Sequence, residues 1–226
     1  MTLDSNETGK CKLYIVDDDE AVRDSLQILA ESYDYETESF VSGTAFLEAA
    51  GRIGSGCVLL DVRMPDIDGL EIQQRLAVSN PGLMVIIITG HGDVPMAVRA
   101  MKSGAFDFIE KPFTDEVLID SLKRARAHRR ELAENQHKGG SDSGPDSDGQ
   151  GDGQIQGRID ELTPRERDVL YQLVIGRPNK TIAYELGISP RTVEVHRARV
   201  MDKMQAKSLS HLVRMSLAAG LQLADE

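Results

Sequence analysis

The sequence has no tryptophan and few aromatic residues, which make up only 4% of its 226 residues. Its hydrophobic cores must therefore be built mainly from aliphatic side chains. Only two cysteines are present, Cys11 and Cys57, and both lie within apolar segments. Two cysteines in such surroundings indicate buried, reduced thiols of a cytoplasmic protein and exclude a disulfide framework.

An apolar run long enough to cross a membrane is also missing. The longest run, residues 83–88, is far shorter than the roughly 20 residues that a spanning helix requires. The first residues have neither the basic region nor the apolar region of a signal peptide. We therefore expect no membrane partner and a cytoplasmic location.

The net charge of −11 argues at first against a nucleic-acid partner, but the charges are unevenly distributed. Residues 1–134 carry 14 basic and 24 acidic side chains, whereas residues 163–215 carry 10 basic and 5 acidic ones. The acidic part and the basic part are therefore expected to be different domains, and the basic part can bind nucleic acid.

The two parts are separated by a segment that has nothing to bury. Residues 139–153 contain only Gly, Ser, Asp, Pro and Gln, which is typical of a disordered linker. A coil of about 23 residues spans roughly 25–30 Å and lets two domains move independently. We predict four segments: an N-terminal tail at 1–11, a first domain at 12–134, a flexible linker at 135–157 and a DNA-binding domain at 158–226.

The first domain alternates short apolar runs with segments of helical periodicity. Between the runs, apolar residues recur three and four positions apart, which predicts five helices. Strands that alternate with helices form a parallel sheet covered on both faces. The sequence therefore predicts an α/β domain with a doubly wound sheet, whose five strands lie at residues 12–16, 35–40, 57–60, 83–88 and 106–109.

The second domain is predicted to be small and all-α, with four helices. Each helix follows a residue that can cap it, and these residues are Thr163, Asn179, Ser189 and Ser208. Thr163 also begins a capping box with proline at the first helical position. The helices at 179–186 and 190–204 are separated by a short turn with Gly187, which is typical of a helix-turn-helix.

Polar side chains stand at the carboxyl ends of four predicted strands: Asp17, Asp18 and Asp19; Asp61; Thr89; and Lys111. In parallel sheets these ends meet at one rim, where ligands bind. An isolated strand-end aspartate is usually a helix cap or a solvated rim residue, and Asp19 is well placed to cap the helix beginning at Glu20. Four matching strand ends together indicate a functional site.

Carboxylates at one rim repel each other, by about 4 kcal/mol for two charges ~4 Å apart at an effective dielectric of 20. Lys111 supplies one compensating charge, and a Mg²⁺ ion held by carboxylates and waters would supply the rest. One carboxylate then becomes a nucleophile toward phosphorus. Thr89 and Lys111 could hold the incoming phosphoryl oxygens.

Four segments of the first domain resemble the receiver domain of the FixJ type: residues 16–19, 60–70, 88–95 and 110–113. The resemblance covers about residues 12–130 and implies a flavodoxin-like strand order. It implies that Asp61 accepts a phosphoryl group, that Asp18 and Asp61 bind Mg²⁺ directly, and that Asp17 binds it through water. The backbone carbonyl of Arg63 would complete the metal site.

The same resemblance implies roles beyond the acidic rim. Thr89 is the switch hydroxyl, Lys111 contacts the phosphate, and Pro112 follows a cis peptide bond. Phe108 matches the aromatic switch position, although an isolated phenylalanine is more typical of a core. FixJ-type receivers dimerise through one surface, which we call the dimer face, and here it comprises Val94, Val98, Met101, Lys102 and Phe106.

The second domain resembles the LuxR-type output domain over about residues 160–222, through residues 162–170, 179–183 and 188–197. One departure is Pro178, where the family usually has Ser or a similar small residue. A recognition helix places its N-terminal residues against base edges. We expect base contacts from Glu194, Val195 and Arg199 and phosphate contacts from Lys180, Arg191 and Lys203. Thr192 is also predicted to belong to the DNA-binding set. A solvated helix face is the alternative for each basic residue.

These features predict a two-component response regulator and not an enzyme. A sensor histidine kinase would phosphorylate Asp61, the protein would dimerise, and the helix-turn-helix would bind promoter DNA. The family also favours an activator that works with RNA polymerase. The alternative is a phosphatase of the haloacid-dehalogenase type, which also uses Asp, Thr and Lys, but Ala21 stands where that motif has Thr or Val. A second alternative is a DNA-binding regulator whose first domain works through protein contact without phosphate. The presence of Asp17, Asp18 and Asp61 together with Lys111 argues against it.

Overall fold

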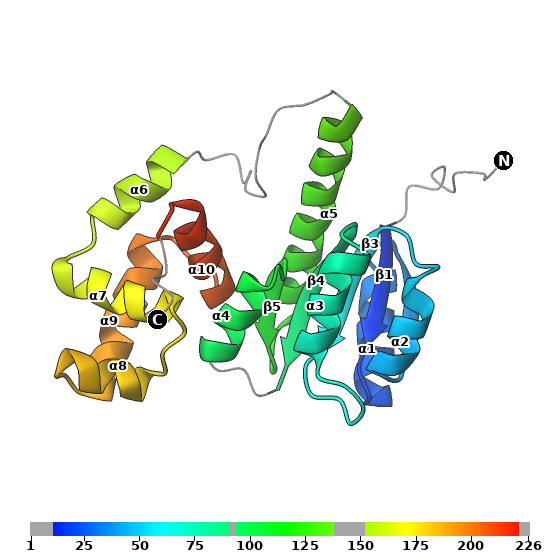
Figure 1. The fold of residues 1–226 in the computed structure, drawn as a ribbon, viewed down its shortest axis with the longest axis horizontal. Coiled ribbons are helices and arrows are strands. Elements are labelled where there is room, and N and C mark those ends of the chain that lie inside the picture. Colours follow the sequence, from blue (N-terminus) through cyan, green and yellow to red (C-terminus); the bar gives the residue numbers. More distant parts are fainter. Residues whose placement is uncertain (1–10, 91–93, 138–151, 222–226) are drawn as a thin grey trace. The chain divides into compact units, whose positions relative to one another are not determined.

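The computed structural model describes residues 11–90, 94–137 and 152–221, and its chain forms two compact units (Figure 1). Residues 1–91 and 103–139 belong to the first unit, and residues 92–102 and 140–226 belong to the second. Residues 1–10 of the predicted tail and most of the predicted linker lie outside the described residues, whereas Cys11 already belongs to the first strand.

The first unit is built on a parallel sheet with the spatial order β2-β1-β3-β4-β5. This is the flavodoxin-like order that the sequence predicted. Each strand agrees with its predicted range to within one residue at either end: β1 (Cys11–Val16), β2 (Tyr35–Phe40), β3 (Gly56–Asp61), β4 (Leu83–Thr89) and β5 (Asp107–Glu110).

Helices follow the strands in alternation: α1 (Glu20–Glu31), α2 (Gly43–Ala50), α3 (Gly69–Ser79), α4 (Val94–Lys102) and α5 (Asp115–His137). Asp19 caps α1 as predicted, because its side chain accepts hydrogen bonds from the backbone of Ala21 and Val22. The helix alternation is the reason that all five strands run parallel.

The main core of the first unit lies between one face of the sheet and helices α1 and α5. Leu26 of α1 and Leu118 and Leu122 of α5 pack there against strand residues such as Ile15 and Ile86. Each fully buried Leu or Ile stabilises the fold by about 1.5–3 kcal/mol. Cys11 and Cys57 lie in the same core as free, buried thiols, as predicted.

Besides α4, which the division of the chain places in the second unit, the described residues of that unit form five helices: α6 (Asp152–Asp160), α7 (Pro164–Val174), α8 (Asn179–Leu186), α9 (Pro190–Lys203) and α10 (Leu209–Ala218). Four were predicted, and α6 is additional. None of the helices in the described ranges is long and apolar enough to span a membrane.

Helix α6 begins inside the predicted linker, and α5 runs past the predicted domain boundary at residue 134. Ile155 and Ile159 lie four residues apart on α6 and are half-buried. The guanidinium of Arg158 donates a hydrogen bond to the backbone carbonyl of Met204 at 3.2 Å. These tertiary contacts stabilise a helix whose own sequence has little helical preference.

The helix starts of the second unit agree with three of the four predicted caps. Thr163 forms the full capping box, and Ser189 and Ser208 each accept a hydrogen bond from the first turn of their helix. The prediction for Asn179 was wrong. Pro178, in extended conformation, occupies the cap position of α8 and makes no side-chain cap bond, so Asn179 is already the first helical residue.

Candidate functional site

The carboxyl ends of four strands bring the predicted polar residues together at one rim of the sheet. Asp17 directly follows β1, Asp61 ends β3, and Thr89 ends β4. Lys111 follows β5, and its backbone N–H donates to the carbonyl of Thr89 at 2.8 Å. The Lys111–Pro112 peptide bond is cis, as the resemblance implied.

Lys111 joins the two buried carboxylates of this rim. Its Nζ donates to Oδ2 of Asp17 at 2.7 Å and to Oδ1 of Asp61 at 3.1 Å. Both carboxylates are almost fully buried, with side-chain exposures of 5% and 9%. One ammonium therefore compensates two carboxylates, which leaves the centre with an excess of negative charge.

Burial has the largest effect on the protonation of Asp61. Burial raises the pKa of the Asp61 carboxyl above its ordinary value, and the negative charge of Asp17 adds to this. Attraction to Lys111 and the backbone hydrogen bond from Arg63 oppose the rise without cancelling it. For Lys111, burial acts against the charged form, but its bonds to Asp17 and Asp61 outweigh burial and raise its pKa.

The loop after β1 is held by a residue that the sequence reasoning missed. Arg23 of α1 is buried, and its guanidinium donates to the backbone carbonyl of Asp17 at 2.8 Å. The backbone N–H of Asp19 donates to Oδ1 of Asp17 at 3.0 Å. A basic residue on the apolar side of a predicted helix was the available signal for Arg23.

The loop after β3 turns back tightly over the end of its own strand. The Arg63 N–H donates to Oδ2 of Asp61 at 2.7 Å, and the Gly69 N–H donates to the carbonyl of Val62 at 2.9 Å. A Cβ atom at Gly69 would lie 2.2 Å from the backbone oxygen of Asp61, so only glycine fits there. In the same loop Asp66 accepts from the Thr44 N–H at 2.7 Å.

Thr89 and Phe108 lie on the same face of the sheet. In the register of β4 and β5, Phe108 is opposite Ile87, two residues before Thr89. Side chains two residues apart on a strand point to the same face, so the two predicted switch residues are diagonal neighbours. Both are buried, with exposures of 0% for Thr89 and 9% for Phe108.

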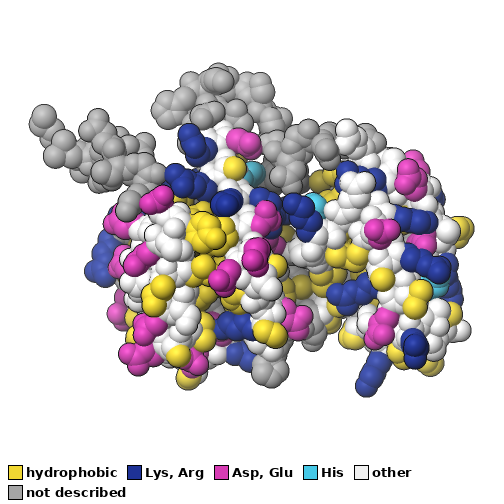
Figure 2. All heavy atoms as spheres, turned by 180° about the vertical axis from the view of Figure 1, so that it is seen from behind, with side chains coloured by type: hydrophobic (Ala, Val, Ile, Leu, Met, Phe, Trp, Pro, Cys, Tyr) yellow, Lys and Arg dark blue, Asp and Glu magenta, His cyan; other side chains and the backbone are white. Residues whose placement is uncertain are grey.

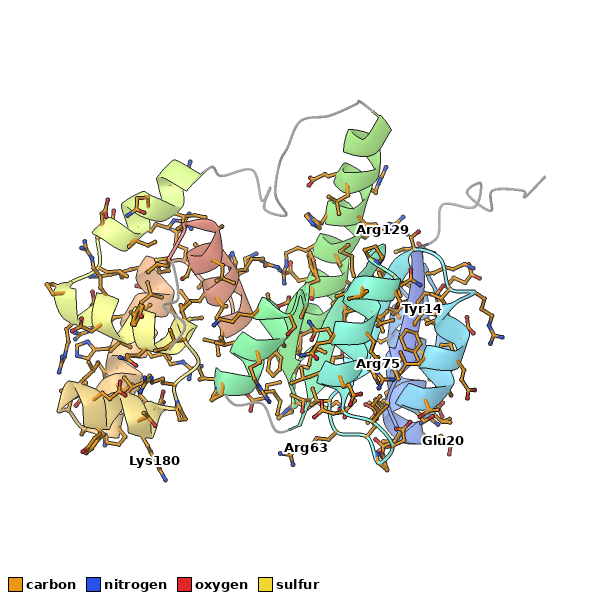
Figure 3. The ribbon with its side chains drawn as sticks, viewed as in Figure 1. Tyr14, Glu20, Arg63, Arg75, Arg129 and Lys180 are labelled. Carbon is orange, nitrogen blue, oxygen red and sulfur yellow. The ribbon has the colours of Figure 1, made fainter. Side chains whose placement is uncertain are left out.

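The donor chemistry of the rim suits a hard divalent cation. Carboxylate and carbonyl oxygens are the ligands that Mg²⁺ prefers, and the centre has a surplus of negative charge. Asp18 is exposed beside buried Asp17, and the side chain of Arg63 points away from the ribbon (Figure 3). Within the described residues, no three acidic, His or Cys side chains are already arranged around a common metal position.

The predicted dimer face is mostly covered in this structure. Val94, Val98 and Met101 have exposures of 9%, 2% and 7%. Lys102 is exposed and Phe106 is half-buried. Three of the four apolar residues of the predicted surface are therefore buried.

The second unit contains the predicted helix-turn-helix. Helices α8 and α9 are joined through Gly187, whose φ of 64° places it in the left-handed region that favours glycine. Ile182 and Ala183 of α8 and Val193 and Val200 of α9 are buried between the helices of this unit. The outer surface of α9 is therefore left for solvent or a ligand.

Most of the predicted DNA-contacting residues are exposed. Arg191, Glu194, Val195 and Arg199 lie exposed along α9, and Thr192 is half-buried beside the Ser189 cap. Lys180 is exposed on α8 and extends away from the ribbon (Figure 3). Tyr184, one turn after Lys180, was not predicted, yet its exposure of 89% is unusual for an aromatic residue.

Lys203 differs from the other basic residues of the predicted set. Its Nζ donates to Oε2 of Glu166 at 2.7 Å and to the carbonyl of Glu161 at 3.2 Å. The bond from Lys203, with the backbone bond from Thr163, lowers the pKa of the buried Glu166 to about 2. An ammonium held in this way joins α9 to α7, and the contact of Lys203 with a DNA phosphate stays a prediction.

The charge difference between the two units is visible on the molecular surface. On the face seen in Figure 2, Asp and Glu side chains gather mainly over the first unit. This agrees with the count of basic and acidic residues along the sequence. A polyanion would therefore be attracted to the basic stretch at residues 163–215 and repelled by the first unit.

Comparison with known families assigns both units. Residues 13–123 match the response regulator receiver domain, and residues 160–216 match the bacterial regulatory proteins of the luxR family. The transcriptional regulatory protein FixJ of Azorhizobium caulinodans is 48% identical over 214 residues, which cover 95% of each chain. FixJ of Rhizobium meliloti is 48% identical over 92% of this chain and 96% of its own.

Solved structures show the same similarity. The crystal structure of full-length FixJ from B. japonicum matches with a TM-score of 0.52 and 44% identity, over 96% of this chain and 100% of that one. The response regulator StyR matches with a TM-score of 0.51 and 38% identity, over 92% and 99% of the two chains. These matches cover both units in one chain and favour a regulator over a phosphatase.

Proposed function

Because this chain belongs to the response regulators that join a receiver domain to a LuxR-type DNA-binding domain, as FixJ does, we propose that a sensor histidine kinase phosphorylates it on Asp61. Phosphorylation then controls dimerisation and the binding of the helix-turn-helix to promoter DNA. The observation that carries this proposal is the contact of one ammonium, that of Lys111, with the buried carboxylates of Asp17 and Asp61.

The proposed reaction is the transfer of a phosphoryl group to the Asp61 carboxylate. An oxygen of Asp61 forms a bond to phosphorus, the bond from phosphorus to the donor breaks, and the donor leaves with that electron pair. Lys111 and the Arg63 N–H already bind the two carboxylate oxygens, so they hold the nucleophile in place. Thr89, at the end of β4, would donate its hydroxyl to a phosphoryl oxygen.

We include Mg²⁺ in this proposal, held by Asp18, Asp61 and the Arg63 carbonyl, with Asp17 acting through water. When bound, the ion would supply positive charge for the oxygens of the incoming phosphoryl group. The two buried carboxylates of Asp17 and Asp61 share the single ammonium of Lys111, which supports a need for such a cation.

Dimerisation through the dimer face requires a change of conformation. Three of the four apolar members of that face, Val94, Val98 and Met101, are at most 9% exposed, and a partner must reach them to use the whole face. We propose that phosphorylation exposes them, with Phe108 turning into the space beside Thr89. Two joined DNA-binding domains then bind two half-sites with a gain from effective concentration.

The receiver part of the proposal is tested with acetyl phosphate and Mg²⁺. Intact-mass analysis of the full chain is expected to show the addition of one phosphoryl group, and sedimentation is expected to show dimers. Asp61→Asn should abolish both, whereas the control Asp24→Asn, an exposed carboxylate of α1, should abolish neither. Dimerisation of Asp61→Asn that responds normally to acetyl phosphate would refute the mechanism.

The output part is tested on promoter DNA. We propose that the phosphorylated dimer activates transcription by RNA polymerase. In a reconstituted transcription assay, adding the phosphorylated protein should raise the yield from a promoter that it binds. A fall in the yield of transcript from the same promoter would show that the protein represses transcription. That result would contradict the proposed activation but not the proposed phosphorylation of Asp61.

A further inference from the structure

A buried ionic cluster connects β5 to α5, outside the phosphoryl site. The Asp107 side chain has an exposure of only 4%. Its Oδ2 accepts a hydrogen bond from the Ser121 hydroxyl at 2.8 Å and forms an ion pair with the Arg124 guanidinium. A buried carboxylate is tolerated only when it is paired and hydrogen-bonded in this way. The cluster therefore fixes how β5 sits against α5.

The same carboxylate also holds the backbone of the proposed switch residue. The other oxygen of Asp107, Oδ1, accepts a hydrogen bond from the backbone N–H of Phe108 at 2.9 Å. One side chain thus binds the strand at Phe108 through one oxygen and α5 through the other. A displacement of the strand at Phe108 must either carry the Asp107 carboxylate with it or break this hydrogen bond.

Asp107 and Phe108 face opposite sides of the sheet. Phe108 shares a face with Thr89, as the register of β4 and β5 requires. Asp107 contacts Ser121 and Arg124, so its side chain points to the face that α5 covers. These two adjacent residues therefore connect the face with the phosphoryl-binding hydroxyl to the face with α5.

Helix α5 can transmit such a displacement along its length. Leu118 and Leu122 hold it on the core, and it continues as one helix to His137, the last described residue before the segment that joins the two domains. A packed helix moves as a rigid element, so a shift at Ser121 and Arg124 reaches its C-terminal end.

We propose that Asp107, held by Ser121 and Arg124, is a positioning residue that couples phosphorylation of Asp61 to α5, so that the signal leaves the receiver along α5 as well as through the dimer face. This inference rests on the proposed function, since it needs Asp61 to be phosphorylated and Phe108 to respond.

The test compares hydrogen–deuterium exchange of α5 in the full chain with and without acetyl phosphate and Mg²⁺. Intact mass reports phosphorylation in every sample. In the wild type we expect phosphorylation to change the exchange of peptides from α5. In Asp107→Asn, which keeps the shape but removes the charge, and in Ser121→Ala, we expect phosphorylation as in the wild type with a smaller change in α5.

Removing one charge from a buried pair can unfold a protein, so a double variant is included. Asp107→Leu with Arg124→Met removes both charges of the buried pair, leaves only the exposed Asp120 without its partner, and removes the bond to the Phe108 N–H. We expect it to fold, to take up phosphate, and to lose the change in α5 altogether. The control is Asp120→Asn, which breaks only the exposed pair between Asp120 and Arg124 and should behave as the wild type.

Two results would overturn the inference and keep the proposed function. In one, the phosphorylated wild type shows no change in α5. In the other, the double variant is phosphorylated and shows the full wild-type change in α5. Absence of phosphorylation in the wild type would instead refute the proposed function, and the intact mass distinguishes that outcome from the other two.

Discussion

Replacing Asp61 by asparagine is expected to stabilise the unphosphorylated protein while it removes the phosphorylation site. The oxygens of Asp17 and Asp61 that contact Lys111 can be no farther apart than the sum of 2.7 and 3.1 Å. At an effective dielectric of about 20, two unit charges at that separation repel by about 3 kcal/mol. Asparagine removes this repulsion and the cost of burying the Asp61 charge.

The substitution also weakens a favourable interaction, because Lys111 loses one of its two carboxylate partners. The raised pKa of Asp61 shows that the unfavourable effects on the ionised carboxylate, burial and repulsion by Asp17, outweigh the favourable contacts with Lys111 and the Arg63 N–H. The amide oxygen of asparagine can still accept one hydrogen bond from Lys111. We therefore expect a net gain of about 1–2 kcal/mol in the free energy of unfolding, which is roughly 3–8 °C in Tm for a domain of this size.

The gain should depend on pH in a defined direction. Because the folded pKa of Asp61 is raised, the ionised carboxylate penalises the fold fully above that pKa, and the penalty disappears as the pH falls to the ordinary value of 3.8. Urea unfolding of the wild type and Asp61→Asn without metal, from neutral pH downward, measures this difference. The control Asp18→Asn, at an exposed carboxylate, should change stability by less than about 0.5 kcal/mol. A variant less stable than the wild type at neutral pH would refute the reasoning.

Three further predictions concern other parts of the structure. Gly69→Ala places a methyl group 2.2 Å from a backbone oxygen and should cost about 2–3 kcal/mol in urea unfolding, whereas Gly82→Ala, with no atom closer than 3.7 Å, should be nearly neutral. Glu166→Gln should cost about 1–2 kcal/mol above pH 4.5 through its weakened bond to Lys203, and the difference should shrink as the pH falls toward the Glu166 pKa of about 2; a loss independent of pH would argue against the ion pair. Arg199→Ala should weaken promoter binding by about 1–3 kcal/mol in a gel-shift titration with phosphorylation intact, and the receiver-surface variant Arg75→Ala should not; equal affinities would remove Arg199 from the interface.

Most of the fold could be predicted because its signals are local. The strands of the receiver are short apolar runs, and three of the four caps in the second unit are residues whose side chains bond within their own helix. The prediction that Asn179 caps its helix was wrong, although it relied on the same kind of local signal as the other three caps. Pro178 begins the helix one residue earlier, and a pattern of capping residues does not reveal that shift.

The acidic rim could be predicted from chain order alone, because parallel strands bring their carboxyl ends to one edge. What the pattern could not show is which side chains share a partner. Arg23 binds the backbone of Asp17 from a helix, and Lys203 is held by Glu166 from 37 residues away. Helix α6 was missed because its stabilising contacts also come from distant residues, including Met204.

The sequence by itself therefore determined the order of strands and helices, the site around Asp61 and the presence of a helix-turn-helix, because these follow from periodicity, capping and motifs within short stretches of chain. The tertiary structure alone decided that Lys111 binds both carboxylates, that Gly69 must lack a side chain, and that Asp107 connects the strand at Phe108 to α5. These features depend on distances and burial between residues far apart in the chain, and such distances exist only once the chain has packed.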